Sequence, residues 1–130
     1  MPEAHPADLK YHPSHDWARV DGDTATLGIT AYAQDQLGEV VFFDPPKIGT
    51  QVTKDSAYAE IESVKAVSDV IAPLSGEIVE VNEQLADAPE KVNVEPYDSG
   101  WLVKIRLSDP GEVDQLLDAD DYEALLAKQS

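Results

Sequence analysis

A single lysine in the middle of the chain, Lys65, stands between two runs of strand-forming residues, and this arrangement most constrains the fold. Before it, Ala59 and Ile61 alternate with two glutamates, which is the pattern of a half-buried strand. After it, small and β-branched residues continue to Pro73, which cannot donate to a sheet and therefore ends the strand. Two short strands joined by a tight turn would place Lys65 at a hairpin tip, far from the core.

Glycines lie on both sides of this segment, and we expect both to occupy turns. Gly49 stands between Ile48 and Thr50, and Gly76 follows Ser75. A lysine taken at random is usually an ordinary solvated side chain. The paired strands and flanking turns favour instead a lysine that is presented to other molecules.

Length and composition bound the class of protein. The 130 residues predict a single domain, 1–130, with a modest core and no apolar run long enough to cross a membrane. The absence of cysteine excludes disulfides, a thiol nucleophile and thiolate metal ligands. The polar, proline-containing residues 1–8 predict a loose N-terminus without a signal or transit peptide, and hence a cytoplasmic protein.

The formal net charge of −17 bears on the partners of the protein. It repels nucleic acid phosphates and anionic lipids, so we expect neither to bind. It suits a monomer that meets basic docking surfaces briefly, in a salt-dependent way. Solubility alone is an equally good reason for such a charge, and composition does not separate the two.

The first half of the chain predicts strands with one short helix. Trp17–Val20 and Thr24–Ile29 flank an Asp-Gly pair, which indicates a hairpin. Thr30 can cap a helix over residues 31–37, and a strand over Val40–Phe43 follows.

The second half predicts two further strands and then helices. Glu77–Asn82 and Trp101–Leu107 alternate as half-buried strands, and the intervening Gln84–Gly100 predicts a long loop. Residues 109–130 predict two helices, the first with Val113, Leu116 and Leu117 on one face, the second capped by Asp118. The fold class is therefore mainly β, with one internal and two C-terminal helices.

Several phrases in this order resemble the H proteins of the glycine cleavage system, over about residues 9–126. The lysine turn Ser63–Ala66 with Pro73–Gly76 resembles their lipoyl-bearing turn. Further phrases that resemble the family are Tyr11–Trp17, Gly28–Gln34, Leu37–Phe42, Val92–Tyr97 and Gly100-Trp101. Two departures are Asp16, where the family more often has glutamate, and Phe43–Pro46, which replaces its usual valine-glutamate-leucine-proline phrase.

This resemblance implies a fold and a function. The fold would be the barrel-sandwich hybrid of lipoyl and biotinyl domains. A lipoate ligase or lipoyl transferase would attach lipoate to Lys65. The carrier, not itself an enzyme, would take an aminomethyl group from glycine decarboxylase to aminomethyltransferase, and electrons to dihydrolipoyl dehydrogenase.

The same resemblance suggests further site residues. Glu62, near the lysine turn, would help the attaching enzyme recognise it, although an edge charge that prevents aggregation explains it equally well. The loaded arm is prone to hydrolysis, so a sheltered cleft is expected. Ser14, Asp16 and Asp69 would bind its amine there, with Ile29 as an apolar wall; the alternative is that they are surface polar groups.

Other functions fit the sequence less well. Biotinyl domains carry methionine on both sides of the lysine, whereas Val64 and Ala66 flank Lys65. Lipoyl domains of 2-oxoacid dehydrogenase acyltransferases usually have aspartate before the lysine and a linker after the domain. A small enzyme that uses paired carboxylates would need a residue set that we cannot identify. A second role in passing lipoate to other lipoyl domains stays open.

No metal or catalytic site is expected. His12 and His15 are three residues apart, but without a well-spaced third ligand they indicate a metal only weakly. The chain has no phosphate-binding glycine loop and no convincing serine–histidine–aspartate order. Trp17 and Trp101 are expected in the core, with their indole N–H groups bonded to carbonyls.

Overall fold

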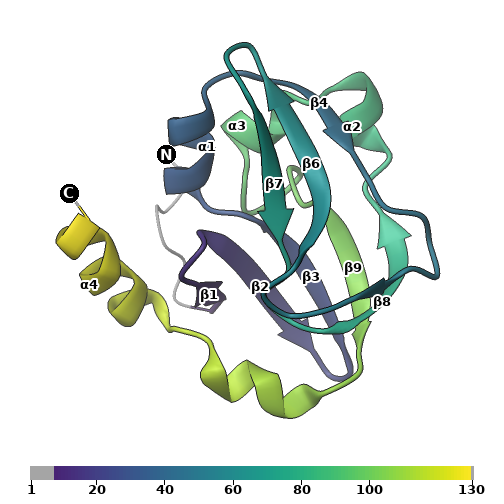
Figure 1. Cartoon of the computed structure of the whole chain (residues 1–130), viewed down its shortest axis with the longest axis vertical. Helices are drawn as coiled ribbons and strands as arrows, with labels where there is room; N and C mark the ends of the chain where they lie inside the picture. Colours follow the sequence, from purple (N-terminus) through teal and green to yellow (C-terminus); the bar gives the residue numbers. More distant parts are fainter. Residues whose placement is uncertain (1–7, 130) are drawn as a thin grey trace.

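The computed structural model describes residues 8–129, and two antiparallel sheets form its centre (Figure 1). The larger sheet has the order β1-β2-β3-β9-β8-β5. The smaller sheet has the order β4-β6-β7. The expected mainly β sandwich is therefore confirmed. The loose N-terminus expected for residues 1–8 lies, except for Asp8, outside the described residues.

The strands of the larger sheet come from the first, middle and last parts of the chain: β1 (Lys10–His12), β2 (Asp16–Asp21), β3 (Thr24–Ile29), β5 (Gln51–Val52), β8 (Gly76–Val81) and β9 (Val103–Leu107). Gly22, with φ of 64°, allows the predicted turn between β2 and β3. The strand predicted over residues 101–107 is present from Val103, and its alternate residues Val103, Ile105 and Leu107 are buried.

The smaller sheet consists of β4 (Val40–Asp44), β6 (Ala57–Ser63) and β7 (Val67–Ile71). Strands β6 and β7 pair antiparallel, so that Glu62 lies opposite Val67. This is the hairpin predicted around Lys65, and it projects beyond the rest of the sheet at the top of Figure 1.

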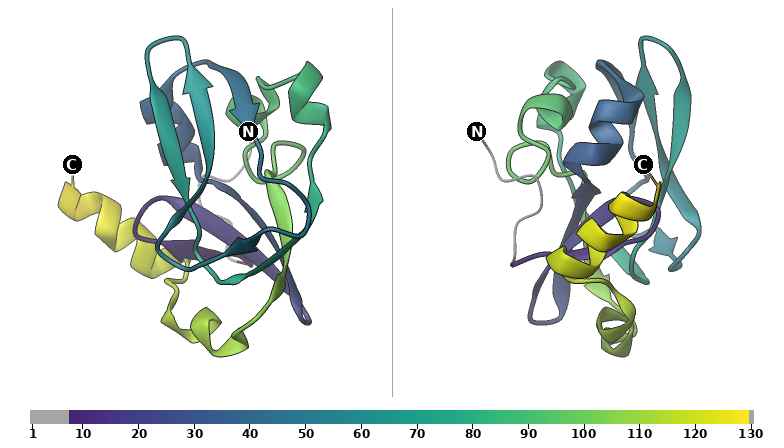
Figure 2. Two further views of the ribbon diagram at one scale, coloured as in Figure 1. Left: turned by 45° about the vertical axis from the view of Figure 1, so that its right-hand side comes forward. Right: turned by 90° about the vertical axis from the view of Figure 1, so that its left-hand side faces the viewer.

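Helix α1 (Ala31–Leu37) has the predicted bounds. The side chain of Thr30 accepts a hydrogen bond from the backbone N–H of Ala33 at its start, and Gly38, with φ of 81°, ends it. Figure 2 shows α1 beside the β6–β7 hairpin. This placement brings the helix next to the lysine turn.

The loop predicted over Gln84–Gly100 is wrong in part, because it contains α2 (Gln84–Asp87) and α3 (Lys91–Val94). Each is a single turn, too short to create a helical period in the sequence. Each buries one apolar residue, Leu85 or Val92. Packing against the core thus stabilises helices that local sequence does not indicate.

Two helical segments follow β9, as predicted, but the first is a 3₁₀ helix, η1 (Pro110–Gln115). The side chain of Asp109 accepts a hydrogen bond from the backbone N–H of Gly111 and caps it. Leu117 lies beyond the helix and pairs with Tyr11 in an isolated bridge. The stripe expected over residues 113–117 is therefore divided between a helix and an extended segment. Helix α4 (Ala119–Gln129) ends the described chain.

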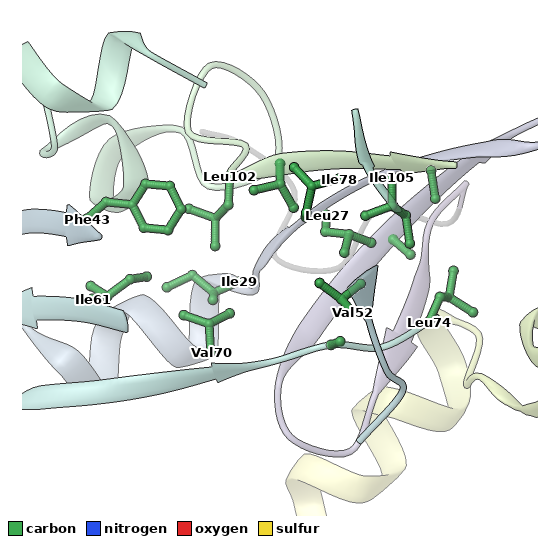
Figure 3. Close-up of a cluster of buried hydrophobic side chains, with 14 of the residues drawn as sticks. Leu27, Ile29, Phe43, Val52, Ile61, Val70, Leu74, Ile78, Leu102 and Ile105 are labelled. Carbon is green, nitrogen blue, oxygen red and sulfur yellow. The ribbon is translucent and has the colours of Figure 1, made fainter. Parts of the chain in front are cut away.

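Two clusters of buried side chains hold these elements together. The larger lies between the two sheets and includes Leu27, Ile61, Ile78 and Ile105 (Figure 3). The smaller joins β1 and β2 to α4 and consists of Leu9, Tyr11, Trp17, Tyr97 and Tyr122.

The aromatic residues of the smaller cluster fix α4 to the sheet. The rings of Tyr11 and Tyr122 stack with centroids 4.8 Å apart. Trp17 is fully buried, and its indole N–H donates to the carbonyl of Pro96 at 2.9 Å, as predicted. Trp101, by contrast, is only half-buried, and Lys104 lies over its ring.

The two glycines expected in turns differ. Gly49 has φ of 95° and lies in a turn. Gly76 instead begins β8 and is buried, because a Cβ at this position would come 2.2 Å from the carbonyl oxygen of Arg106 on β9. Close approach of two strands, and not a turn, requires glycine there.

No helix within residues 8–129 has the length and apolarity that crossing a bilayer demands.

Candidate functional site

Lys65 lies at the exposed tip of the β6–β7 hairpin, in a turn that contains no glycine. The hydroxyl of Ser63 closes the turn by accepting hydrogen bonds from the backbone N–H groups of Lys65 and Ala66, at 3.3 and 3.2 Å. The N–H of Val64 donates to the carbonyl of Glu39, which ties the tip to the chain that follows α1. The turn therefore presents the lysine without any need for unfolding.

The side chain of Lys65 lies against the C-terminal end of α1. Its Cε atom is 3.4 Å from the position that a Cβ would take at Gly38. Because Gly38 has a positive φ and no side chain, it ends the helix and leaves room for the aliphatic part of the lysine.

A cleft of about 270 Å³ lies between α1, the β6–β7 pair and the segment that begins β2. Ser14, Asp16, Ile29 and Asp69, the four residues predicted to share a binding site, all line it. They come from three separate parts of the chain: the segment that begins β2, the end of β3 and β7. The structure thus brings the predicted set together, while their roles stay predictions.

The cleft has an apolar wall and a polar end. Ile29 and Ile61 are buried among its apolar lining residues, which also include Leu37 and Val70. Asp16 is only 2% exposed, and it accepts a hydrogen bond from the hydroxyl of Ser14 at 2.7 Å. Burial raises the pKa of the Asp16 carboxyl well above its usual value, and the bond from Ser14 opposes this rise. Asp69, which also lines the cleft, is exposed.

Glu62 lies outside this cleft. It is half-buried at the end of β6, with Phe42 of β4 and Val67 of β7 as its register partners. It therefore stands beside the lysine turn, as expected from the sequence.

The two histidines considered as metal ligands have other partners. The Nε2 atom of His12 is 2.6 Å from a carboxylate oxygen of Asp55, and its Nδ1 atom is 2.6 Å from the hydroxyl of Ser14. His15 bonds through Nδ1 to the hydroxyl of Tyr122. Within the described part of the chain, no three histidine, aspartate or glutamate side chains are grouped as a metal site would need.

Sequence reasoning missed several residues of the site. Tyr32, Ala33, Gln36 and Leu37 line the cleft from α1, and their helical spacing could have shown that they share a face. Asp55 reaches His12 across 43 residues of chain, so no local pattern connects them. Tyr58 also went unnoticed; among residues 8–129 its buried hydroxyl finds no hydrogen-bond partner.

Comparison with known proteins gives one consistent family. The family model described as glycine cleavage H-protein matches residues 9–129. The chain is 52% identical over 125 residues to a glycine cleavage system H protein from Halorhodospira halophila, covering 95% of this chain and 96% of that protein. It is 50% identical over 115 residues to the mitochondrial H protein 2 of Arabidopsis thaliana, covering 88% of this chain and 74% of the relative.

A solved structure agrees with these sequences. The crystal structure of a glycine cleavage system H protein from Mycobacterium marinum superposes with a TM-score of 0.85 at 38% identity, over 94% of this chain and 98% of that one. The chain therefore belongs to the glycine cleavage H-protein family, whose members are lipoyl-bearing, non-catalytic carriers of the glycine cleavage system.

Proposed function

We propose that Lys65 is the residue that bears the lipoyl group, as an amide of its side-chain amine. The observation that carries this proposal is its place at an exposed hairpin tip, directly beside a cleft with an apolar wall and a polar end. The apolar wall fits an aliphatic arm, and the polar end fits a charged cargo. When attached, lipoate supplies a ring disulfide that opens and closes, so the redox chemistry belongs to the cofactor.

The cleft residues have separate roles in this proposal. Asp16 and Asp69 supply carboxylates for the ammonium of the aminomethyl cargo, and the hydroxyl of Ser14 is a further polar partner. Ile29 contributes an apolar surface that keeps water from the cargo. Glu62, outside the cleft, is proposed to contact the enzyme that attaches lipoate.

The partners follow from membership in the family. The carrier would meet glycine decarboxylase, aminomethyltransferase and dihydrolipoyl dehydrogenase in turn, and a lipoate ligase or lipoyl transferase before them. A net charge of −17 supports brief docking to basic surfaces by a monomer. Similarity to H proteins of bacteria supports a cytoplasmic setting.

Intact mass with peptide mapping tests the attachment site. The protein is made together with a lipoate ligase and supplied lipoate, and a gain of one lipoyl group on Lys65 is expected. Lys65→Arg should abolish the gain, whereas Lys47→Arg, an exposed lysine in another turn, should keep it. An unmodified Lys65 beside a competent ligase would refute the proposal.

Hydrolysis of the aminomethyl-loaded carrier tests the cleft separately. Asp16→Asn and Asp69→Ala should each speed hydrolysis, because each removes a carboxylate partner of the ammonium. Asp35→Ala, an exposed aspartate on α1 that does not line the cleft, is the matched control and should leave the rate unchanged. Equal rates in all three variants and the wild type would show that the cargo does not rest there.

A further inference from the structure

A continuous chain of hydrogen bonds connects the cleft to the surface. The carboxyl of Asp16 is 2.7 Å from the hydroxyl of Ser14, which is 2.6 Å from Nδ1 of His12. Nε2 of His12 is in turn 2.6 Å from the carboxylate of Asp55. The first residue is nearly inaccessible, whereas the side chain of Asp55 is 63% exposed. Three short contacts thus run from the interior to solvent.

Contacts this short between oxygen and nitrogen atoms require one proton in each. Two arrangements satisfy all three. In the first, Asp16 is protonated and donates to Ser14, the reverse of the bond that Ser14 donates to an ionised Asp16. Ser14 then donates to Nδ1 of His12, and Nε2–H donates to Asp55. In the second, Asp16 is a carboxylate that accepts from Ser14, and His12 is an imidazolium that donates to Ser14 and to Asp55.

The two arrangements contain the same number of protons and the same net charge. They differ only in that one proton has passed from Asp16 to Ser14 while another has passed from Ser14 to His12. The backbone N–H of Ser14, 3.1 Å from Nδ1, favours the first arrangement, because it needs the lone pair of that nitrogen. For a cleft without a cation, this bond favours the arrangement with the proton on Asp16.

We propose that His12 is the proton acceptor for Asp16: when the cargo ammonium enters the cleft, the proton moves through Ser14 to His12, and Asp16 becomes a carboxylate that pairs with the cation. When the cargo leaves, the proton returns. His12 and Asp55 are then positioning residues that adjust the charge of Asp16. This inference rests on the proposed use of the cleft by the loaded arm.

The electrostatics of Asp16 and Asp55, at the two ends of the hydrogen-bond chain, support the proton transfer between Asp16 and His12. An unpaired carboxylate in the interior is costly, so a cleft without cargo is more stable with a neutral Asp16. Burial accordingly raises the pKa of Asp16, whereas the hydrogen bond from His12 is the largest cause of a lowered pKa at Asp55. Asp55 thus stays a carboxylate and stabilises the imidazolium.

Other titratable groups face this chain. Lys54 is 3.4 Å from the carboxylate of Asp55, and Asp69 of β7 lines the same cleft as Asp16. The pKa of Tyr58 on β6 is raised well above its usual value by burial and then by the charge of Asp16. Tyr122 on α4 also has a raised pKa, first through burial. Both tyrosines therefore stay neutral while the proton moves, and His15 is bonded to Tyr122.

Nitrogen NMR of the histidine ring and infrared spectroscopy of the carboxyl test the proposal directly. Lipoylated protein is compared before and after loading with glycine and glycine decarboxylase. On loading, the His12 ring should change from neutral to imidazolium, and the protonated-carboxyl band of Asp16 should disappear. The bands are assigned by their absence in His12→Gln and Asp16→Asn.

The His12→Gln variant adds a measurement that a merely structural role would not change. Glutamine can bond to Ser14 and Asp55 but cannot accept a proton, so loading should release about one more proton per molecule to the buffer than in the wild type. If this variant does not fold, the wild-type spectra still decide. A His12 ring that stays neutral in the loaded protein would overturn the proposal.

The outcome also separates this inference from the function on which it rests. If Asp16→Asn speeds hydrolysis but His12 stays neutral, the cleft holds the cargo and no proton moves. If Asp16→Asn changes nothing and His12 stays neutral, both proposals fail.

Discussion

The side-chain carbonyl of Asn93 on α3 accepts a 2.8 Å hydrogen bond from the backbone N–H of Val40 on β4. The amide nitrogen of the same side chain donates to the carbonyl of Gly38 and to the side chain of Gln34. One residue thus fixes the end of α1 and the start of β4. This is the backbone against which the side chain of Lys65 lies.

Asn93→Ala should lower the free energy of unfolding by about 2 kcal/mol, because the Val40 N–H and the Gly38 carbonyl lose their partner. Denaturant unfolding measures the loss, and hydrogen exchange at Val40 should accelerate. Val94→Ala, an exposed neighbour on α3, is the control and should change stability by less than about 0.5 kcal/mol. Equal effects of the two variants would contradict this account of α3.

Asp16→Asn should alter the pH dependence of stability. Because burial raises the pKa of Asp16 in the folded protein, the fold holds a proton that the unfolded chain has lost. The folded and unfolded chains differ in this proton at pH values between the usual aspartate pKa of 3.8 and the raised pKa of Asp16 in the fold. Wild-type stability therefore falls as pH rises through that window, by up to about 1.4 kcal/mol per pH unit. The neutral amide of the variant does not share this loss.

Thermal unfolding of both proteins across this window checks the prediction. The stability of the wild type relative to Asp16→Asn should be greatest below the usual aspartate pKa and should decrease as pH rises. A difference in melting temperature that does not vary with pH would mean that Asp16 is not a neutral buried group in the fold.

Gly76→Ala should destabilise the fold by about 3 kcal/mol, because the new Cβ would collide with the backbone of Arg106 and force β8 from β9. Gly111→Ala is the matched control. The nearest atom to its Cβ is a side-chain oxygen of Asp109 at 3.3 Å, so its effect should stay within about 0.5 kcal/mol. Chemical denaturation of both variants gives the comparison. A mild effect at Gly76 would show that the two strands separate easily.

Glu62→Gln should slow lipoate attachment by about tenfold if its carboxylate makes a charged contact with the attaching enzyme. Glu60→Gln, on the same face of β6 but farther from the turn, is the control and should react at the wild-type rate. A time course of lipoylation by mass spectrometry measures both. Equal rates in the two variants would make Glu62 an edge charge only.

The sequence predicted those features that depend on short-range pattern. Alternation revealed β9, and the cap at Thr30 with the glycine at 38 fixed α1. The hairpin around Lys65 needed only the strand runs on either side of it. Grouping Ser14 and Asp16 with Ile29 and Asp69 depended on family resemblance, because Ile29 and Asp69 lie in two other, distant parts of the chain.

The features that sequence did not reveal depend on tertiary packing. Helices α2 and α3 are single turns, so no helical periodicity of apolar residues in the sequence indicated them. Gly76 was expected in a turn because the sequence alone does not show whether a glycine serves a turn or the close approach of a neighbouring strand. The bond from His12 to Asp55 exists only because β1 lies near the segment before β6.

The bridge between Tyr11 and Leu117 joins the start of the chain to a segment near its end, and this affects the order in which the parts fold during synthesis. The hairpin that carries Lys65 makes contacts that are close along the chain: β6 pairs with β7 and β4, and Val64 bonds to Glu39. The segment that holds Ser14 and Asp16 is instead held in place by Tyr122 near the end of the chain, whose hydroxyl bonds to His15 and Thr30. A nascent chain can therefore display its lysine before the shelter for the cargo is complete.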